Sequence, residues 1–113
     1  MADLTLTELA AKLPANTFTE SADDVTVSLK TLTGEAAVQL DDEVLAEVVT
    51  KLLSGAASAQ VEHNAVEGAE PIGSYPQPNF GNPVAQDDGS FTARRTHTIA
   101  VSIPLNVDEA VAV

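Results

Sequence analysis

The clearest alternation of apolar and polar positions in the chain runs from Phe91 to Leu105. Every second residue, from Phe91 through Ile99 to Leu105, falls on one face, and the other face carries mostly small and hydroxyl-bearing side chains. A period of two in residues rich in Thr, Ile and Val predicts a half-buried β-strand. The stretch also carries both arginines of the chain, Arg94 and Arg95, so it resembles a framework with functional groups placed on it.

A longer period predicts the main helix. Adjacent apolar pairs recur every four residues and fall on one stripe: Val44, Leu45, Val48, Val49, Leu52 and Leu53. The acidic run 41–43 precedes the stripe and Lys51 lies near its end, as the helix dipole favours. Ser54 and Gly55 are predicted to cap the helix, and the segment that follows is open to helix or extended chain. We expect this helix to pack across the sheet.

The N-terminal segment LTLTELAAKLP predicts a short helix. Thr5 and Glu8 fit a capping box, and Leu4 and Leu9 stand where a hydrophobic staple would place them. Pro14 ends the helix. A helix of about two turns is marginal in water, so its apolar side is expected to lie on the body of the domain or on a neighbour.

Residues 25–32 (VTVSLKTL) predict a second strand, because Val25, Val27 and Leu29 alternate with polar residues. The preceding residues 15–24 are interpreted as a loop, and Thr33 with Gly34 as a turn. Residues 36–40 alternate again, which leaves two interpretations open. They form the return strand of a hairpin, which we favour, or the first turn of the main helix.

Residues 67–90 have no period and are punctuated by prolines and glycines. Because proline interrupts strand ladders and helices alike, regular structure is excluded over most of this segment. We interpret the segment as an extended, functional arm. Four apolar side chains are its candidate anchors: Ile72, Tyr75, Phe80 and Val84. Whether they lie on their own chain or on a neighbour stays open, and 87–90 is predicted to turn into the following strand.

These patterns together predict an α+β fold with a small antiparallel sheet, one main packed helix, a short N-terminal helix and a long proline-rich extended arm. We expect a single domain over 1–113, with an N-terminal part at 1–66, the arm at 67–90, and the C-terminal strand and tail at 91–113. The chain has three Phe, one Tyr and no Trp. The core is therefore expected to rest on Leu, Val and Ile, to be thin and to be completed by another chain.

The net charge of −12, from 17 acidic and 5 basic residues, argues against whole classes of partner. A nucleic acid or an anionic membrane needs clustered cations, so neither is expected to bind. The absence of cysteine excludes disulfides and thiolate chemistry. The N-terminus lacks the features of a secretory signal, and no stretch approaches the ~18 apolar residues of a membrane span. We expect a soluble chain that is not secreted by a signal peptide and that lies in the cytoplasm.

Motifs that would carry catalysis are missing. The paired carboxylates at 23–24, 41–43 and 87–88 lack the spacing of a calcium loop and are interpreted as turns or caps. His63 and His97 belong to no metal-ligand pair, and only an unforeseen proximity would make an acid–base pair of His97 with Glu62. Serine-nucleophile motifs and phosphate-binding glycine loops are also absent from the sequence. We therefore predict no enzymatic activity, no cofactor and no metal.

Arg94 and Arg95 are adjacent, so they point to opposite faces of the predicted strand. One interpretation is an internal salt bridge to one of the 17 acidic residues. The other is a bidentate bridge across an interface, where arginine is enriched. The second interpretation places both arginines among the candidate partner-binding residues, beside the four apolar residues of the arm.

The layout of a capped N-terminal helix (LTLTELAAKLP), a proline-punctuated arm (PIGSYPQPNFGNP) and a strand-rich end (THTIAVSIPL) resembles that of small structural proteins of tailed-phage virions. Decoration or cement proteins of the capsid are the most similar kind, in size and layout and not in a motif. The resemblance implies attachment to the major capsid protein, bracing of the shell, and self-association around symmetry axes. It places the chain in the virion if it is viral, and otherwise in the cytoplasm. The leading hypothesis is a non-enzymatic assembly protein that clasps its neighbours. The alternatives are a small acidic binding or adaptor module and a neck or tail component of a virion.

Overall fold

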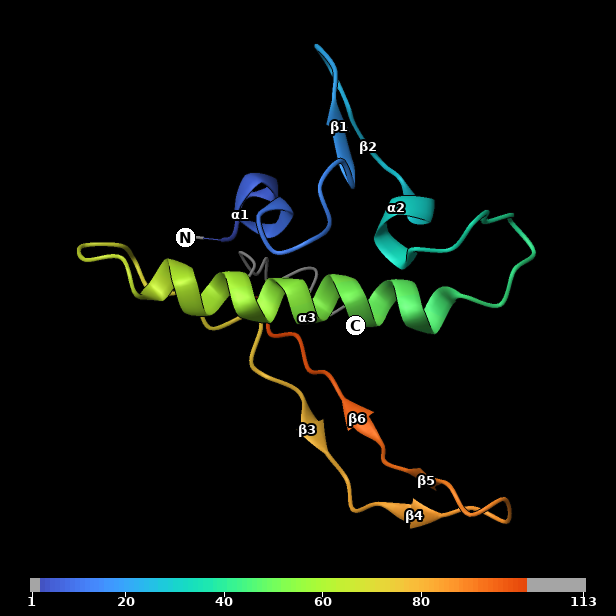
Figure 1. Ribbon diagram of the computed structural model, residues 1–113. Coiled ribbons are helices and arrows are strands. Elements are labelled where there is room, and N and C mark those ends of the chain that lie inside the picture. Colours follow the sequence, from blue (N-terminus) through green and yellow to red (C-terminus); the bar gives the residue numbers. More distant parts are fainter. Residues whose placement is uncertain (1–2, 102–113) are drawn as a thin grey trace, which may run out of the picture.

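A computed structural model describes residues 3–101 of the chain. A helix of 20 residues, α3 (Leu45–Asn64), runs through the middle of the fold. Two short helices, α1 (Leu6–Ala10) and α2 (Leu29–Thr33), pack along one side of α3 (Figure 1). The fold is α+β with one main packed helix and a short N-terminal helix, as the sequence predicts.

Three two-stranded antiparallel sheets complete the described part of the chain. They pair β1 (Phe18–Glu20) with β2 (Val25–Val27), β3 (Asn79–Phe80) with β6 (Arg95–Thr96), and β4 (Val84–Ala85) with β5 (Phe91–Thr92). The β1–β2 hairpin stands on the side of α1 and α2, whereas β3 to β6 form one long, bent hairpin on the opposite side of α3 (Figure 1). We call residues 79–96 the arm hairpin.

The capping box of α1 is confirmed. The backbone N–H of Glu8 donates to Thr5 Oγ1 at 3.1 Å, and the backbone N–H of Thr5 donates to Glu8 Oε1 at 3.0 Å. Two of the N–H groups that a helix start leaves without partners are thereby satisfied. This reciprocal pair fixes where the short helix begins, and the apolar side of α1 packs on α3 as expected.

The predicted end of the main helix is wrong. Gly55 lies in the interior of α3, which continues through the ambiguous segment to Asn64. A Cβ at position 55 would lie 2.8 Å from Leu13 Cδ2 and 3.2 Å from Leu9 Cδ1. The glycine therefore lets α1 and the residues that follow it approach α3 closely, and it does not cap the helix. The missing side chain serves packing between helices.

The second predicted strand is half right. Val25–Val27 is a strand, but its partner is Phe18–Glu20, inside the segment interpreted as a loop. The chain then leaves the strand at Ser28, whose Oγ accepts the backbone N–H of Thr31 at 3.2 Å and begins α2. A strong N-cap thus overrides the alternation in 29–32. Gly34, at φ 76°, ends α2, and residues 36–40 form neither the favoured hairpin strand nor a helical turn.

The long strand predicted over 91–105 is also wrong over its described part. Only Phe91–Thr92 and Arg95–Thr96 pair, each with a different partner strand, and residues 97–101 have no ladder. The ladder breaks opposite Gly81–Pro83, where proline offers no N–H. Residues 91–96 are exposed, so this strand is not half-buried and makes no sheet beneath α3. Positions 102–105 lie outside the described residues.

The described residues bury a small apolar core: Leu32, Ala56, Ala57, Ala59 and Ile72. Three of the five are alanines of α3, so the core rests on Leu and Ile at only two positions. Leu32 and Thr17 are its largest fully buried side chains. The core of the described residues is thin, as predicted, because small side chains let the three helices lie close together without enclosing much volume. The prediction that it rests on Leu, Val and Ile is wrong, since alanines form most of it and no valine belongs to it. Its completion by another chain stays a prediction.

Candidate functional site

The root of the arm is held on α3 by two side-chain amides. Asn64 Nδ2 donates to the carbonyl of Ile72 at 2.9 Å, and the backbone N–H of Ile72 donates to Asn64 Oδ1 at 2.8 Å. One turn earlier on α3, Gln60 Oε1 accepts the backbone N–H of Tyr75 at 2.8 Å. These hydrogen bonds satisfy backbone groups of an irregular segment and thereby fix the segment on α3.

The four predicted anchors of the arm divide into two pairs. Ile72 is 5% exposed and packs on its own chain, and Tyr75 is half-buried with its hydroxyl donating to Asp3 Oδ1 at 3.1 Å. Phe80 and Val84 lie on the arm hairpin and are 65% and 59% exposed. Regular structure is absent from most of residues 67–90, as predicted, and the exceptions are the two-residue strands β3 and β4. Two anchors hold the arm, and the other two are presented to the outside.

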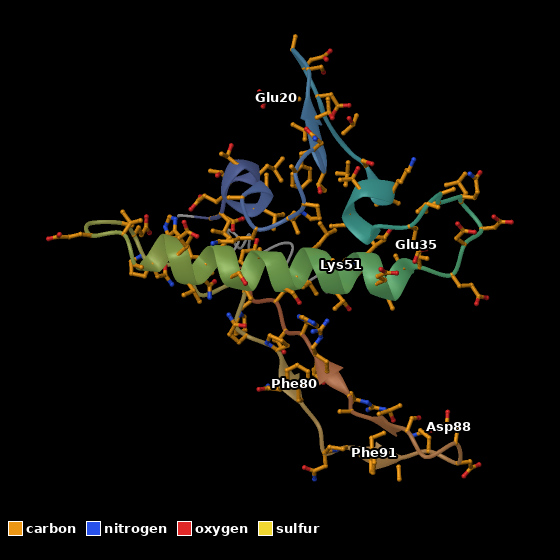
Figure 2. All side chains as sticks on the ribbon, in the orientation of Figure 1. Glu20, Glu35, Lys51, Phe80, Asp88 and Phe91 are labelled. Atoms are coloured by element: carbon orange, nitrogen blue, oxygen red, sulfur yellow. The ribbon has the colours of Figure 1, made fainter. Side chains whose placement is uncertain are left out.

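The arm hairpin is a bare two-stranded ribbon. Phe91, which the sequence pattern placed on a core face, is 70% exposed and lies with Phe80 along this ribbon (Figure 2). An isolated two-stranded hairpin is marginally stable in water, and both of its edges carry unpaired backbone groups. Aromatic side chains are enriched at protein interfaces, so the exposed Phe80 and Phe91 make this ribbon a candidate contact surface.

The apex of the arm hairpin is the predicted turn at Asp87–Ser90. Asp88 Oδ1 accepts the backbone N–H of Ser90 at 2.9 Å and its hydroxyl at 2.6 Å, and Gly89 takes the left-handed φ of 86°. The hydrogen bonds from the hydroxyl and then the amide of Ser90 lower the pKa of Asp88. The turn therefore holds the carboxylate of Asp88 in a fixed position and favours its ionised form.

The two arginines lie near the root of the arm hairpin. Arg95 stands opposite Phe80 in the β3–β6 ladder, with its Cζ 5.8 Å from the centre of the ring. Arg94 contributes its backbone carbonyl to the N–H of Gly81 at 2.6 Å. Within residues 3–101 neither arginine forms an ion pair with a carboxylate, so the predicted internal salt bridge is not found there. The interface role of both arginines stays a prediction.

His63 joins α1, α3 and the arm. Its Nδ1 lies 2.6 Å from Glu8 Oε2 and its Nε2 lies 2.9 Å from the carbonyl oxygen of Glu70. Both neighbours are acceptors, so the ring satisfies both only as the imidazolium. The hydrogen bond to Glu8, and to a lesser extent that to Glu70, raises the pKa of His63. The hydrogen bond from the Thr5 amide, and to a lesser extent that to His63, lowers the pKa of Glu8. This histidine is a structural link between three segments.

His97 makes none of the pairs that catalysis would need in the described part of the chain. Its Nε2 is buried and has no hydrogen-bond partner there, and it forms no bond to Glu62. Among residues 3–101, no group of three or more His, Cys, Asp or Glu side chains is placed to hold a metal ion. The acidic pairs at 23–24 and 87–88 instead close the turns of the two hairpins, as predicted.

A cavity that the sequence did not reveal lies where α2, α3, β6 and the residues after α1 meet. Its volume is about 400 Å³, and it is lined by Lys12, Leu13, Pro14, Leu32, Lys51, Ser54, Gly55, Ser58 and Arg95. We call it the basic pocket, since three of its residues are cationic. The cations are spread over more than 80 positions of the sequence, so no local pattern could have grouped them.

Comparisons with models of known protein families, with curated proteins and with solved structures found no match to this chain. Over the described residues, no helix combines the length and the apolar character that crossing a bilayer requires.

The candidate site consists of two parts that the geometry above defines. They are the arm hairpin, with its exposed aromatic side chains, and the basic pocket beside its root.

Proposed function

We propose that this chain is a non-enzymatic structural assembly protein that clasps neighbouring subunits with its arm hairpin. The observation that carries the proposal is the contrast between the two ends of the arm. The root is fixed on α3 through Ile72 and Tyr75, while Phe80, Val84 and Phe91 are exposed on the projecting ribbon. A rigid root and an exposed apolar ribbon are what a clasp needs, because little freedom is lost when a preorganised element docks.

The extent of the exposed surface supports the same proposal. The radius of gyration is 17.6 Å, whereas about 13 Å is expected for a compact chain of this length. The accessible surface is 8591 Å², roughly 2,700 Å² more than a globular chain of this mass exposes. One partner in a standard interface buries about 800 Å², so the excess is large enough for several interfaces. A chain this open gains stability by covering its arm with a neighbour.

The backbone of the arm hairpin offers a second means of attachment. Both edges of a two-stranded sheet carry free N–H and C=O groups, to which a strand of a neighbour can add. Such main-chain bonds would join the apolar contacts of Phe80 and Phe91. Together they account for affinity without any catalytic group.

Within this class we propose a capsid decoration or cement protein of a tailed phage, attached to the major capsid protein and to copies of itself. The support is the layout of the chain, namely a small capped core with an arm that reaches outward. In this role the arm hairpin spans the gap between subunits and resists their separation. A neck or tail component of a virion would use the same arm against a different neighbour.

The test removes the arm hairpin and keeps its root. Residues 79–96 are replaced by a short Asn-Gly turn that leaves Ile72 and Tyr75 in place, and the mass of the purified particle is measured by light scattering and sedimentation. We expect the full chain to form oligomers and the shortened chain to be a folded monomer by circular dichroism. A shortened chain that assembles like the full chain refutes the proposal.

A pair of point variants separates apolar clasping from general stickiness. Phe80→Ser and Phe91→Ser, on the arm hairpin, should weaken assembly. Val66→Ser is the matched control, because Val66 is 59% exposed but lies outside the arm.

Mass spectrometry of purified virions tests the capsid role. The chain should be present in a fixed ratio to the major shell protein, and its absence contradicts that role.

The net charge of −12 supports one alternative, a small acidic adaptor that binds a basic partner. An adaptor of this kind would keep its partner after the arm hairpin is removed. It would lose the partner at high ionic strength, because exposed charges are screened. The shortened chain therefore distinguishes the two functions directly.

A further inference from the structure

The basic pocket concentrates positive charge in an acidic chain. Lys12, Lys51 and Arg95, three of the five lysines and arginines of the chain, line a cavity of about 400 Å³. None of its described lining residues carries a carboxylate. Three other hollows of the described surface are, by contrast, lined in part by Asp or Glu. The lining is therefore suited to an anionic group that the pocket does not itself contain.

The polar groups of the pocket are only partly occupied. Lys12 pairs with Glu62, and Lys51 pairs with Glu47 at 3.2 Å and donates to the Thr33 carbonyl at 3.0 Å. Both carboxylates lie outside the lining, and ion pairs this exposed exchange readily for another carboxylate. Each ammonium has three donors, so Lys12 can take two more acceptors and Lys51 one more.

The third cation of the pocket is Arg95. Its guanidinium offers the planar fork that binds a carboxylate in bidentate fashion. Its Cζ lies 5.8 Å from the centre of the Phe80 ring, so it links the pocket to the arm hairpin. Ser54 also lines the pocket, but its Oγ is shielded and does not add to the donors.

We propose that the basic pocket receives the aspartate turn of the arm hairpin, Asp87 and Asp88, from a second copy of this chain. The inference rests on the proposed clasping function and names its partner and its receptor. Asp88 is held in a preformed turn by Ser90. Figure 2 shows Asp88 at the far end of the arm hairpin from α3, which carries Lys51, so the turn does not reach the pocket of its own chain.

The geometry of the arm favours this turn over the other aspartate turn. The β1–β2 hairpin ends at Asp23 and Asp24, but it spans only residues 18–27, whereas the arm hairpin spans 79–96 and carries Phe80 and Phe91. An arm that inserts into the pocket of the next copy makes a head-to-tail contact. Such contacts close into rings or continue as filaments, which is the form of association a shell lattice uses.

The experiment measures self-association of the full chain by sedimentation velocity over a concentration series, at about 50 mM and about 500 mM NaCl. The double variant D87N/D88N should weaken self-association at least about tenfold, as removal of close interfacial charge pairs does. The variant D23N/D24N is the matched control, with the same change of charge on the other hairpin, and should shift association by less than about twofold. Asparagine at 88 keeps the Oδ1 acceptor for Ser90, so the turn is preserved.

The pocket side is tested with its own pair. Lys51→Gln should weaken self-association, while Lys30→Gln, outside the pocket lining, should not. Mixing D87N/D88N with Lys51→Gln should restore a dimer and nothing larger, because one intact turn meets one intact pocket. That result is specific to a head-to-tail contact.

Several outcomes overturn the inference. A wild-type chain that stays monomeric at every concentration refutes it, as does equal loss in D23N/D24N and D87N/D88N. Uptake of inorganic phosphate by the pocket, seen as chemical-shift changes at Ser54 with no change in mass, also refutes it and assigns the pocket to a small anion. If the chain without its arm hairpin assembles normally, the proposed function fails as well. If the chain without its arm hairpin fails to assemble but the charge variants associate like the wild type, the clasping function stands and the inference alone is wrong.

Discussion

Asn64 allows the sharpest test of how the arm is held. Its side-chain amide donates to the carbonyl of Ile72 at 2.9 Å and accepts the N–H of Ile72 at 2.8 Å. Because Ile72 is 5% exposed, Asn64→Ala leaves a donor and an acceptor of its backbone with little access to water. Each lost bond contributes about 1 kcal/mol net, and a buried group without a partner costs about 1–3 kcal/mol. We therefore expect Asn64→Ala to destabilise the root of the arm by about 2–4 kcal/mol.

Amide hydrogen exchange measured by NMR reports this loss locally. Since about 1.4 kcal/mol is tenfold, the amide of Ile72 should exchange roughly 30- to 1,000-fold faster in Asn64→Ala. Gln60→Ala removes one bond, to the N–H of Tyr75, and should show a smaller acceleration. Amides in α2 should be unchanged in both variants. If exchange at Ile72 stays within about threefold of the wild type, the amide bridge does not hold the arm and the reasoning is wrong.

Three further perturbations test the fold beneath the arm. Gly55→Val should destabilise the chain by about 1–3 kcal/mol in urea unfolding, because the new side chain collides with Leu9 and Leu13. The control Ala46→Val, at an exposed position of α3, should cost well under 1 kcal/mol. Leu32→Ala removes the largest buried apolar side chain and should cost about 2–5 kcal/mol, so a melting temperature within a degree or two of wild type contradicts the assigned core. The raised pKa of His63 contributes stability that is fully present below its ordinary pKa of 6.5 and is lost as the pH rises through the pKa of the folded state. The lowered pKa of Glu8 contributes stability that is present above its ordinary pKa of 4.5 and is lost as the pH falls through the pKa of the folded state. Thermal stability should therefore fall as the pH rises above about 6.5 in the wild type and fall less in His63→Gln. Parallel curves for the two proteins would exclude the link.

Local sequence signals were sufficient where the deciding contacts lie within a few residues. The capping box of Thr5 and Glu8, the stripe of the main helix and the Asp87–Ser90 turn each depend on neighbours two to four positions away. In the capping box and the turn, side chains satisfy backbone groups of neighbouring residues whatever the rest of the fold does. The α+β class and the thin core followed from the same patterns and from the scarcity of aromatic residues.

Alternation failed where a local capping group or a distant partner competed with it. Ser28 begins a helix inside a stretch that alternates like a strand, and the ladder of the arm hairpin is interrupted between residues 81–83, which include Pro83, and residues 93–94. A period of two shows that a strand is possible, but burial depends on whether a layer covers it. No layer covers the arm hairpin within the described residues, so its apolar residues face outward.

Only the tertiary structure decided which predicted residues act together. The sequence by itself placed apolar anchors at Ile72, Tyr75, Phe80 and Val84, and its net charge of −12 predicts no nucleic-acid partner. It did not divide those anchors into root and ribbon, because the division depends on the amides of Gln60 and Asn64 across the fold. Nor did it group Lys12, Lys51 and Arg95, since a pocket made by three separate segments leaves no spacing to read in the chain. Contacts within a turn are encoded locally, whereas a shared cavity exists only once the helices have packed.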